Sequence, residues 1–314
     1  MIPILTVTLN PALDLATSAG TVRPGPKLRC EEPRADPGGG GINVARMIRR
    51  LGGEVRAFTA LGGATGTRLA RLMERERLDV LRFDGPGETR ESLSVTDRES
   101  GAQYRFVMPG PTWGRAAGRA ATASIAAAAD PGALVVLSGS LPPGLPHDLP
   151  ATLARRIAAR GARLVLDTSG ETLARAARPP RPVHVLRMDG AEAEALVASR
   201  LRTRGDTADF AESLVRRGAA EIVVVARGPD GSVMATRDGR WFAAAAAVPV
   251  KSKVGAGDSF VAAFTLALAR GRALPRALQE GMAAASAAVM TEATDLARAA
   301  DARRLVAACP VGPV

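Results

Sequence analysis

Five short, continuous apolar segments constrain the fold of this 314-residue chain more than any other feature of its sequence. They are Ile4–Leu9, Ala133–Gly139, Arg163–Gly170, Val183–Arg187 and Glu221–Gly228. Apolar runs of this kind are typical of strands that are buried on both faces of a parallel sheet. Helical patterns lie between or after them, at Ile42–Leu51, Gly66–Glu76, Leu149–Arg160, Ala191–Ser199, Thr207–Arg217 and Asp258–Ala269. Strands that alternate with helices predict an α/β layered fold with a mostly parallel central sheet.

Two segments, Leu13–Pro33 and Glu88–Met108, do not follow this alternation. They alternate polar and apolar residues around turn residues, which predicts antiparallel strands with one face in water. The sequence DRESGAQ, Asp97–Gln103, is a plausible hairpin turn. We expect residues of about 13–36 and 88–108 to build a small sheet that projects from the main body as a lid or a dimer contact. No long linker or internal repeat divides the chain, so residues 1–314 are predicted to form a single domain.

The amino-acid composition limits the kinds of molecule that this protein is expected to bind. The net charge of +11 raises the question of nucleic-acid binding, but the arginines are scattered over alanine-rich helices and aromatic residues make up only 3%. An anionic small substrate suits this charge better. No apolar run reaches the roughly 18–20 residues of a membrane span, and the N-terminus does not read as a signal peptide. Cys30 and Cys309 form neither a disulfide framework nor a metal cluster. We therefore expect a cytoplasmic protein with no nucleic-acid or membrane partner.

The segment KVGAGDSF, from Lys253 to Phe260, combines small residues with a carboxylate at a predicted helix start. Free backbone amides at a helix N-terminus form an anion site. A carboxylate there, Asp258, is suited to remove a proton from a hydroxyl group that attacks a phosphoryl group. It is equally suited to cap the helix. The local pattern does not decide between these two roles.

Four consecutive glycines, Gly38–Gly41, precede the next helix of interest, which carries Asn43 near its start. Such a run is typical either of a slack loop or of a surface where amides approach a ligand closely. Asp14 follows the first predicted strand, and Ser138 and Gly139 end the second, where parallel sheets commonly bind ligands. Taken singly, each of these has an ordinary structural explanation. The chain contains neither a P-loop nor the dinucleotide-binding glycine pattern.

Together, these motifs and their order resemble those of the phosphofructokinase B-type family of sugar kinases, which has the ribokinase fold. The likeness runs nearly end to end, through TLNPALD, KLRC, PGGGGINVAR, GGATG, QYRFVMPG, SGSLPPG, LDTSGE and VGAGDSF. It implies a three-layer sandwich with a small β lid. It also implies transfer of the ATP γ-phosphate to the 1-hydroxyl of fructose 6-phosphate, which gives fructose 1,6-bisphosphate.

The resemblance assigns roles on the acceptor side. Asp258 matches the catalytic base, and Gly255, Ala256 and Gly257 match the anion hole for the transferring phosphoryl group. The residues that match contacts to the sugar hydroxyls are Asp14, Gly39, Gly40 and Asn43. The residues that match the basic side of the sugar site are Lys27, Arg29, Arg90 and Arg105, with Lys27 and Arg90 expected at the 6-phosphate. Ser138 and Gly139 match the strand edge beside the sugar.

The donor side departs from the family pattern. The usual Lys-Pro-Asn-x-x-Glu stretch reads RMDGAE, so that Arg187 and Asp189 replace two of its residues and Glu192 is retained. Glu192 is expected to hold Mg²⁺ through a water molecule. The remaining positions matched to the nucleotide are Ala226, Gly228 and Lys253. The implied cofactor is Mg²⁺ with ATP, a monovalent cation stays open, and the lid is the expected dimer interface.

Three functional hypotheses remain. The first is an ATP-dependent kinase for fructose 6-phosphate. The second is a kinase for another ketohexose phosphate, such as fructose 1-phosphate or tagatose 6-phosphate, or one with altered donor preference. The third is a sugar-phosphate-binding protein with little kinase activity. The intact GAGD motif argues against the third, because a protein that only binds sugar has no need of the base.

Overall fold

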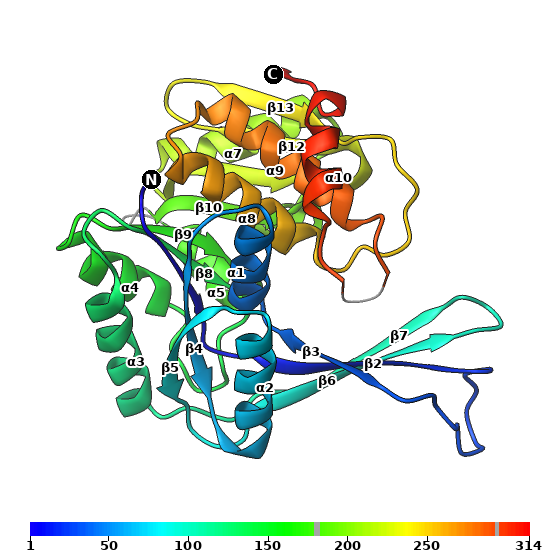
Figure 1. The fold of residues 1–314 in the computed structure, drawn as a ribbon. Helices are drawn as coiled ribbons and strands as arrows, with labels where there is room; N and C mark the ends of the chain where they lie inside the picture. Colours follow the sequence, from blue (N-terminus) through cyan, green and yellow to red (C-terminus); the bar gives the residue numbers. More distant parts are fainter. Residues whose placement is uncertain (179–182, 293–294) are drawn as a thin grey trace.

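The computed structural model describes residues 1–178, 183–292 and 295–314. Its centre is a ten-stranded sheet in the order β14-β13-β12-β11-β10-β9-β8-β1-β4-β5 (Figure 1). The strands from β11 to β5 are parallel, and the three pairings beyond β11 are antiparallel. The predicted α/β fold with a mostly parallel central sheet is confirmed.

The strands of this sheet are β1 (Ile4–Thr8), β4 (Arg56–Leu61), β5 (Asp79–Asp84), β8 (Leu134–Ser138), β9 (Arg163–Asp167), β10 (Val183–Asp189), β11 (Ala220–Ala226), β12 (Gly231–Ala235), β13 (Arg240–Ala244) and β14 (Val311–Pro313). The helices are α1 (Gly40–Arg50), α2 (Gly63–Arg75), α3 (Arg115–Ala128), α4 (Leu149–Ala158), α5 (Gly170–Ala176), α6 (Gly190–Val197), α7 (Arg204–Arg216), α8 (Ala256–Ala269), α9 (Leu274–Ala288) and α10 (Ala299–Arg304). Two short 3-10 turns occupy Gly228–Asp230 and Leu305–Ala308.

Helices cover both faces of the large sheet, which makes three layers. On one face, α1, α8 and α9 bury side chains such as Ile42, Phe264 and Leu278. On the other face, the helices from α3 to α7 bury side chains such as Ile125 and Leu153. Because both faces are covered, the central strands are apolar on both sides, and this explains the continuous apolar runs in the sequence. No helix in the described part of the chain is long and apolar enough to cross a membrane.

A second sheet of four strands extends from this body as a narrow arm (Figure 1). Its order is β3-β2-β6-β7, with β2 (Ala12–Ala19), β3 (Arg34–Gly38), β6 (Arg90–Asp97) and β7 (Gln103–Val107). The outer pairings are antiparallel, and the hairpin between β6 and β7 turns at the predicted place. The central pair, β2 and β6, runs parallel. Parallel pairing needs a long crossover connection, and the stretch of chain between β2 and β6, which includes α1 and α2, supplies one.

Some elements were not predicted from the sequence. β4 and β5 carry polar residues among their apolar ones, and α3 and α9 consist mostly of alanine with few large apolar residues. The segment Arg34–Gly38 forms β3 although it contains a proline and a glycine. It pairs only with β2 and is an edge strand, the position in a sheet that tolerates such residues.

Candidate active site

The candidate base, Asp258, lies in the first turn of α8. This helix begins at Ala256, directly after Gly255, whose φ of 74° lies in the left-handed region. Gly255 is therefore the residue that precedes the helix, and Asp258 is not its N-cap. The Asp258 carboxylate instead accepts a hydrogen bond from Asn43 Nδ2 on α1, with Oδ2 at 2.9 Å. The Asp258 carboxylate therefore faces the first turn of the neighbouring helix α1, next to the glycine-rich segment.

The surroundings of Asp258 tune its acidity. Its pKa is raised to about 6, chiefly by burial and then by the nearby Asp167 carboxylate, while Asn43 and Arg187 oppose the rise. Burial disfavours a charged carboxylate because the protein replaces water with a poorer solvent for the ion. A carboxyl group with this pKa is ionised at neutral pH and accepts a proton more readily than an ordinary aspartate.

Asp167, which the sequence reasoning left without a role, connects three strand ends. Its Oδ2 accepts a hydrogen bond from Ser138 Oγ at 3.0 Å, and its Oδ1 accepts one from Arg187 Nη1 at 3.0 Å. Its backbone carbonyl accepts the amide of Gly139 at 2.9 Å. A signal for it was present: Asp167 ends the buried strand β9, at the same edge of the sheet as Ser138, the last residue of β8.

The four glycines allow α1 to approach the strand ends closely. A Cβ atom on Gly40 would overlap Ser138 Oγ and lie 2.8 Å from the Gly139 nitrogen. A Cβ atom on Gly38 would overlap the Asp14 carboxyl group. Gly39 has a φ of 117°, which disfavours any residue with a side chain. These glycines do not form a slack loop, because they lie in close contact with neighbouring segments of the chain.

Three of the predicted acceptor residues share one face of the small sheet. The register aligns Ala12 with Arg90, and Ala16 with Ser94 and Arg105, so Asp14 lies between the two arginines on the same face. Burial raises the pKa of Asp14 to about 6, although Arg90 and Arg105 oppose the shift. Arg90 also donates to the carbonyl oxygens of Asn10 and Met108, each at 3.3 Å. One face of the sheet therefore presents a carboxylate between two cations.

Lys27 and Arg29 are not brought to this face. Both are exposed and lie in the connection between β2 and β3, at the far end of the small sheet (Figure 1). No described residue forms a hydrogen bond or an ion pair with the side chain of either. Their assignment to the sugar site therefore remains a prediction.

On the donor side, the Arg187 side chain lies next to the first turn of α8. A Cβ atom on Gly257 would meet the Arg187 Nη1 atom at 3.1 Å. The Arg187 Nε atom is buried and has no hydrogen-bond partner among the described residues. Its pairing with Asp167 holds the guanidinium group at the predicted anion hole, formed by Gly255, Ala256 and Gly257.

The other donor-side residues have local roles or are exposed. Asp189 and Glu192 form a capping box at the start of α6: Asp189 Oδ1 accepts the Glu192 amide at 2.9 Å, and Glu192 Oε2 accepts the Asp189 amide at 2.8 Å. Ala226 aligns with Asp189 in the sheet, and Gly228 follows at a φ of 59°. Lys253 is exposed, and no described residue pairs with its side chain.

The described residues do not form a ready-made metal cage, because no group of three acidic, histidine or cysteine side chains converges among them. Mg²⁺ keeps several waters and is usually held by one or two carboxylates together with substrate phosphates. Burial raises the pKa of Glu192, with the neighbouring Asp189 adding to the effect. A nearby cation would favour the ionised form of such a carboxylate.

Comparison with known proteins agrees with this geometry. The family model described as "pfkB family carbohydrate kinase" matches residues 8–299. The chain is 39% identical to the ATP-dependent 6-phosphofructokinase isozyme 2 of Mycobacterium tuberculosis, over 96% of this chain and 88% of that protein. It is 38% identical to the isozyme 2 of Escherichia coli K12, over 98% and 99% of the two chains.

Among solved structures, phosphofructokinase-2 from Escherichia coli in complex with fructose-6-phosphate superposes with a TM-score of 0.90 and 36% identity. The match covers 98% of this chain and 99% of the other. The two structures therefore share their fold over essentially the whole chain. On these grounds the chain belongs to the pfkB family of carbohydrate kinases.

Proposed function

We propose that the protein is an ATP-dependent 6-phosphofructokinase that phosphorylates the 1-hydroxyl of fructose 6-phosphate. The observation that carries this proposal is the hydrogen bond between Asn43 and Asp258, which joins the acceptor-side helix α1 to the candidate base on α8. Names of relatives at 38–39% identity support fructose 6-phosphate as the acceptor.

In the proposed reaction, the 1-hydroxyl oxygen attacks the γ-phosphorus of ATP. The bond between that phosphorus and the β–γ bridging oxygen breaks, ADP leaves, and Asp258 takes the hydroxyl proton. The amides at Gly255–Gly257 and the Arg187 guanidinium are placed to stabilise negative charge on the transferring group. Phosphoryl transfer depends mainly on such positioning and charge stabilisation, because it needs no covalent intermediate on the protein.

The small sheet supplies the acceptor contacts. Asp14 is suited to accept hydrogen bonds from sugar hydroxyls, while Arg90 and Arg105 provide the positive charge that a 6-phosphate requires. Lys27 and Arg29 lie in the connection between β2 and β3, at the tip of the small sheet. They would contact the sugar phosphate only if such a tip reached a bound sugar. We propose that these tips meet in a homodimer formed through the small sheets.

Exposed apolar side chains support the dimer proposal. Tyr104 and Phe106 on β7 are 40% and 52% exposed, and Val107 on the same strand is 63% exposed. An edge strand with large exposed apolar side chains is a predicted contact site. A second copy of the arm would cover them.

Mg²⁺ is proposed as the metal, with Glu192 as the carboxylate that would hold it through a water molecule. Bound Mg²⁺ would neutralise phosphate oxygens of ATP and so favour attack on the γ-phosphorus. Asp189 contributes by fixing the Glu192 backbone and side chain through the capping box. Arg187, Ala226 and Lys253 differ from the residues that the family usually has on the donor side. The preference for the nucleotide donor should therefore be measured.

A coupled assay of the purified protein tests the proposal. It measures ADP formation with ATP and Mg²⁺ on fructose 6-phosphate, fructose 1-phosphate and tagatose 6-phosphate, with and without potassium. The highest kcat/KM is expected with fructose 6-phosphate. A higher value with either other sugar phosphate would favour the second kinase hypothesis. Sugar-phosphate binding by calorimetry without turnover of any substrate would make the protein a binder and overturn the kinase proposal.

A further inference from the structure

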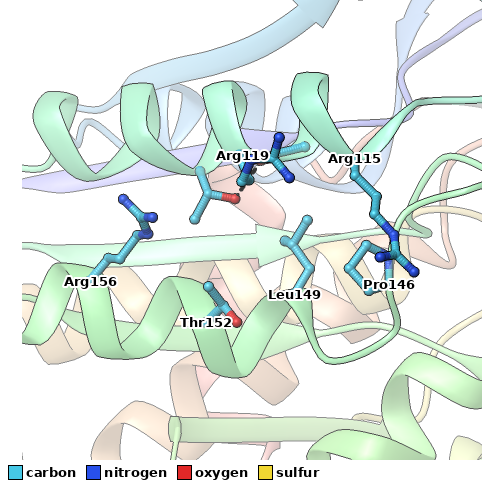
Figure 2. Close-up of a pocket in the computed structure, with 8 residues that line it drawn as sticks. Arg115, Arg119, Pro146, Leu149, Thr152 and Arg156 are labelled. Carbon is cyan, nitrogen blue, oxygen red and sulfur yellow. Dashed lines mark hydrogen bonds between the residues drawn. The ribbon is translucent and has the colours of Figure 1, made fainter.

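A cavity of about 330 Å³ lies between α3 and α4, on the helical layer opposite α1 and α8 (Figure 2). Its lining residues are Arg115, Gly118, Arg119, Thr122, Pro146, Leu149, Thr152 and Arg156. None of them belongs to the candidate active site. The volume lies within the range of pockets that hold small molecules, at the lower end.

Three arginines from two helices surround this cavity. Arg115 and Arg119 are four residues apart on α3, and Arg156 extends from α4 toward α3 (Figure 2). The lining contains no carboxylate, and no described residue pairs with any of the three guanidinium groups. Helix-surface arginines elsewhere in the chain do pair at this spacing, as Arg216 does with Glu212. Like charges that face one cavity repel each other, and an anion between them would remove that repulsion.

The walls of the cavity are fixed by packing. Leu149 projects between the two helices and is only 3% exposed (Figure 2). Thr122 is buried, and its hydroxyl donates to the Gly118 carbonyl at 2.7 Å. A Cβ atom on Gly118 would lie 2.6 Å from Leu145 Cδ2, so α3 packs directly on the loop that precedes α4. The two helices that carry the three exposed arginines are therefore held against each other by packing.

We propose that this cavity is a binding site for a small organic anion that carries two or more negative charges on phosphate or carboxylate groups. Guanidinium groups bind such oxyanions through paired hydrogen bonds, and three of them can engage two anionic groups at once. Leu149 and Pro146 provide apolar contact for a short carbon skeleton between those groups. The concave shape and small volume fit a small molecule rather than a protein segment.

Calorimetry on the full chain tests this site. The probe is methylenediphosphonate, a hydrolysis-resistant small dianion or trianion, titrated in EDTA with the candidate active site saturated by fructose 6-phosphate and a non-hydrolysable ATP analogue. Saturable binding with one site per chain is expected. The readout is binding, not turnover, so its failure is distinct from failure of the proposed kinase activity. Absence of saturable binding up to the solubility limit of the probe would overturn the site.

Two charge-matched variants decide where the probe binds. The double variant Arg119→Ala/Arg156→Ala removes two cavity arginines, and we expect it to weaken binding at least about tenfold because charge-assisted hydrogen bonds are lost. The control Arg160→Ala/Arg237→Ala removes the same charge from two exposed arginines outside the cavity and should bind as the unaltered chain does. Equal weakening in both variants would mean diffuse attraction to a basic surface and would refute the site. Tighter binding of an acidic peptide than of the probe would refute the small-molecule assignment.

Discussion

Asn43 and Asp258 are separated by 215 positions in the chain, and their side chains are hydrogen-bonded at 2.9 Å. The Asn43 amide is itself oriented, because its Oδ1 accepts a hydrogen bond from Arg46 Nη1 at 3.3 Å. Arg46 is buried and paired with Glu76, at 2.6 Å, and it also donates to the Pro37 carbonyl. A continuous series of hydrogen bonds therefore connects Glu76, at the end of α2, with the candidate base Asp258.

Asp258→Asn should abolish most of the phosphoryl transfer while leaving sugar affinity largely intact. The amide cannot accept the hydroxyl proton, and loss of a general base typically lowers the rate by roughly 10²–10⁴-fold. Steady-state kinetics with fructose 6-phosphate give kcat, and calorimetry gives the affinity for the sugar. Preserved turnover with lost sugar binding would contradict the assigned role.

The same substitution should stabilise the protein at neutral pH. The pKa of Asp258 is raised from the ordinary aspartate value of 3.8 to about 6 in the folded protein, so the folded state holds this proton more tightly than the unfolded state. Ionisation of Asp258 therefore lowers the stability of the unaltered protein as pH rises through this window, by about 3 kcal/mol at most. Asp258→Asn removes that loss and is expected to raise the free energy of unfolding.

Urea unfolding at two pH values measures this effect. The stability gain of Asp258→Asn should be fully present above about pH 6, should shrink as pH falls toward about 4, and should vanish below that, where the aspartate becomes neutral in both states. A gain that is constant over this range would show that the folded-state pKa is not raised. Asp238→Asn, on an exposed turn, is the matched control.

Asn43→Ala should move the acid limb of the kcat profile to higher pH. The Asn43 hydrogen bond lowers the pKa of Asp258, so its removal raises that pKa and leaves less of the base ionised at a given pH. The pH dependence of kcat reports this shift, which a merely structural role would not produce. Gln279→Ala removes an amide on α9 that donates to the Val306 carbonyl and has no bond to Asn43 or Asp258, and it should leave the profile in place.

Arg90→Ala should raise the KM for fructose 6-phosphate by at least about tenfold, as expected for a charge-assisted contact to phosphate. The KM for ATP should change little. Arg90→Lys keeps the charge but not the bonds to the Asn10 and Met108 carbonyls, so it separates the electrostatic contribution from the structural one. An effect confined to ATP would place Arg90 on the donor side.

Gly40→Ala should cost about 1–3 kcal/mol of stability and weaken sugar binding, because its Cβ atom would force α1 away from Ser138 and Gly139. Gly205→Ala is the matched control, since Gly205 also lies in a first helical turn and its Cβ atom would meet only Thr203 Oγ1 at 3.5 Å. Thermal unfolding and calorimetry measure the two effects. Equal behaviour of the two variants would mean that Gly40 is not needed for close approach.

The sequence by itself determined the layered α/β fold and the main motif segments. Apolar runs without alternation require strands that are covered on both faces, and the helical segments between them supply the cover. The strand end at Ser138 and the helix start at Gly255–Asp258 were identifiable because each combines a structural boundary with a polar or flexible residue. Asp14 was expected to close the first strand, but that strand ends at Thr8 and Asp14 lies within β2 of the small sheet. Local pattern could not show that Asp258 bonds Asn43 rather than capping α8.

Tertiary structure alone decided how these segments meet. Asp167 became important only because β8, β9 and β10 are neighbours in the sheet, which brings Ser138 and Arg187 to its two carboxylate oxygens. The parallel pairing of β2 with β6, and the cavity that residues of α3 and α4 line together, likewise join segments far apart in sequence. Sequence patterns report local conformation and burial, whereas long-range pairing is set by the packing of the whole chain.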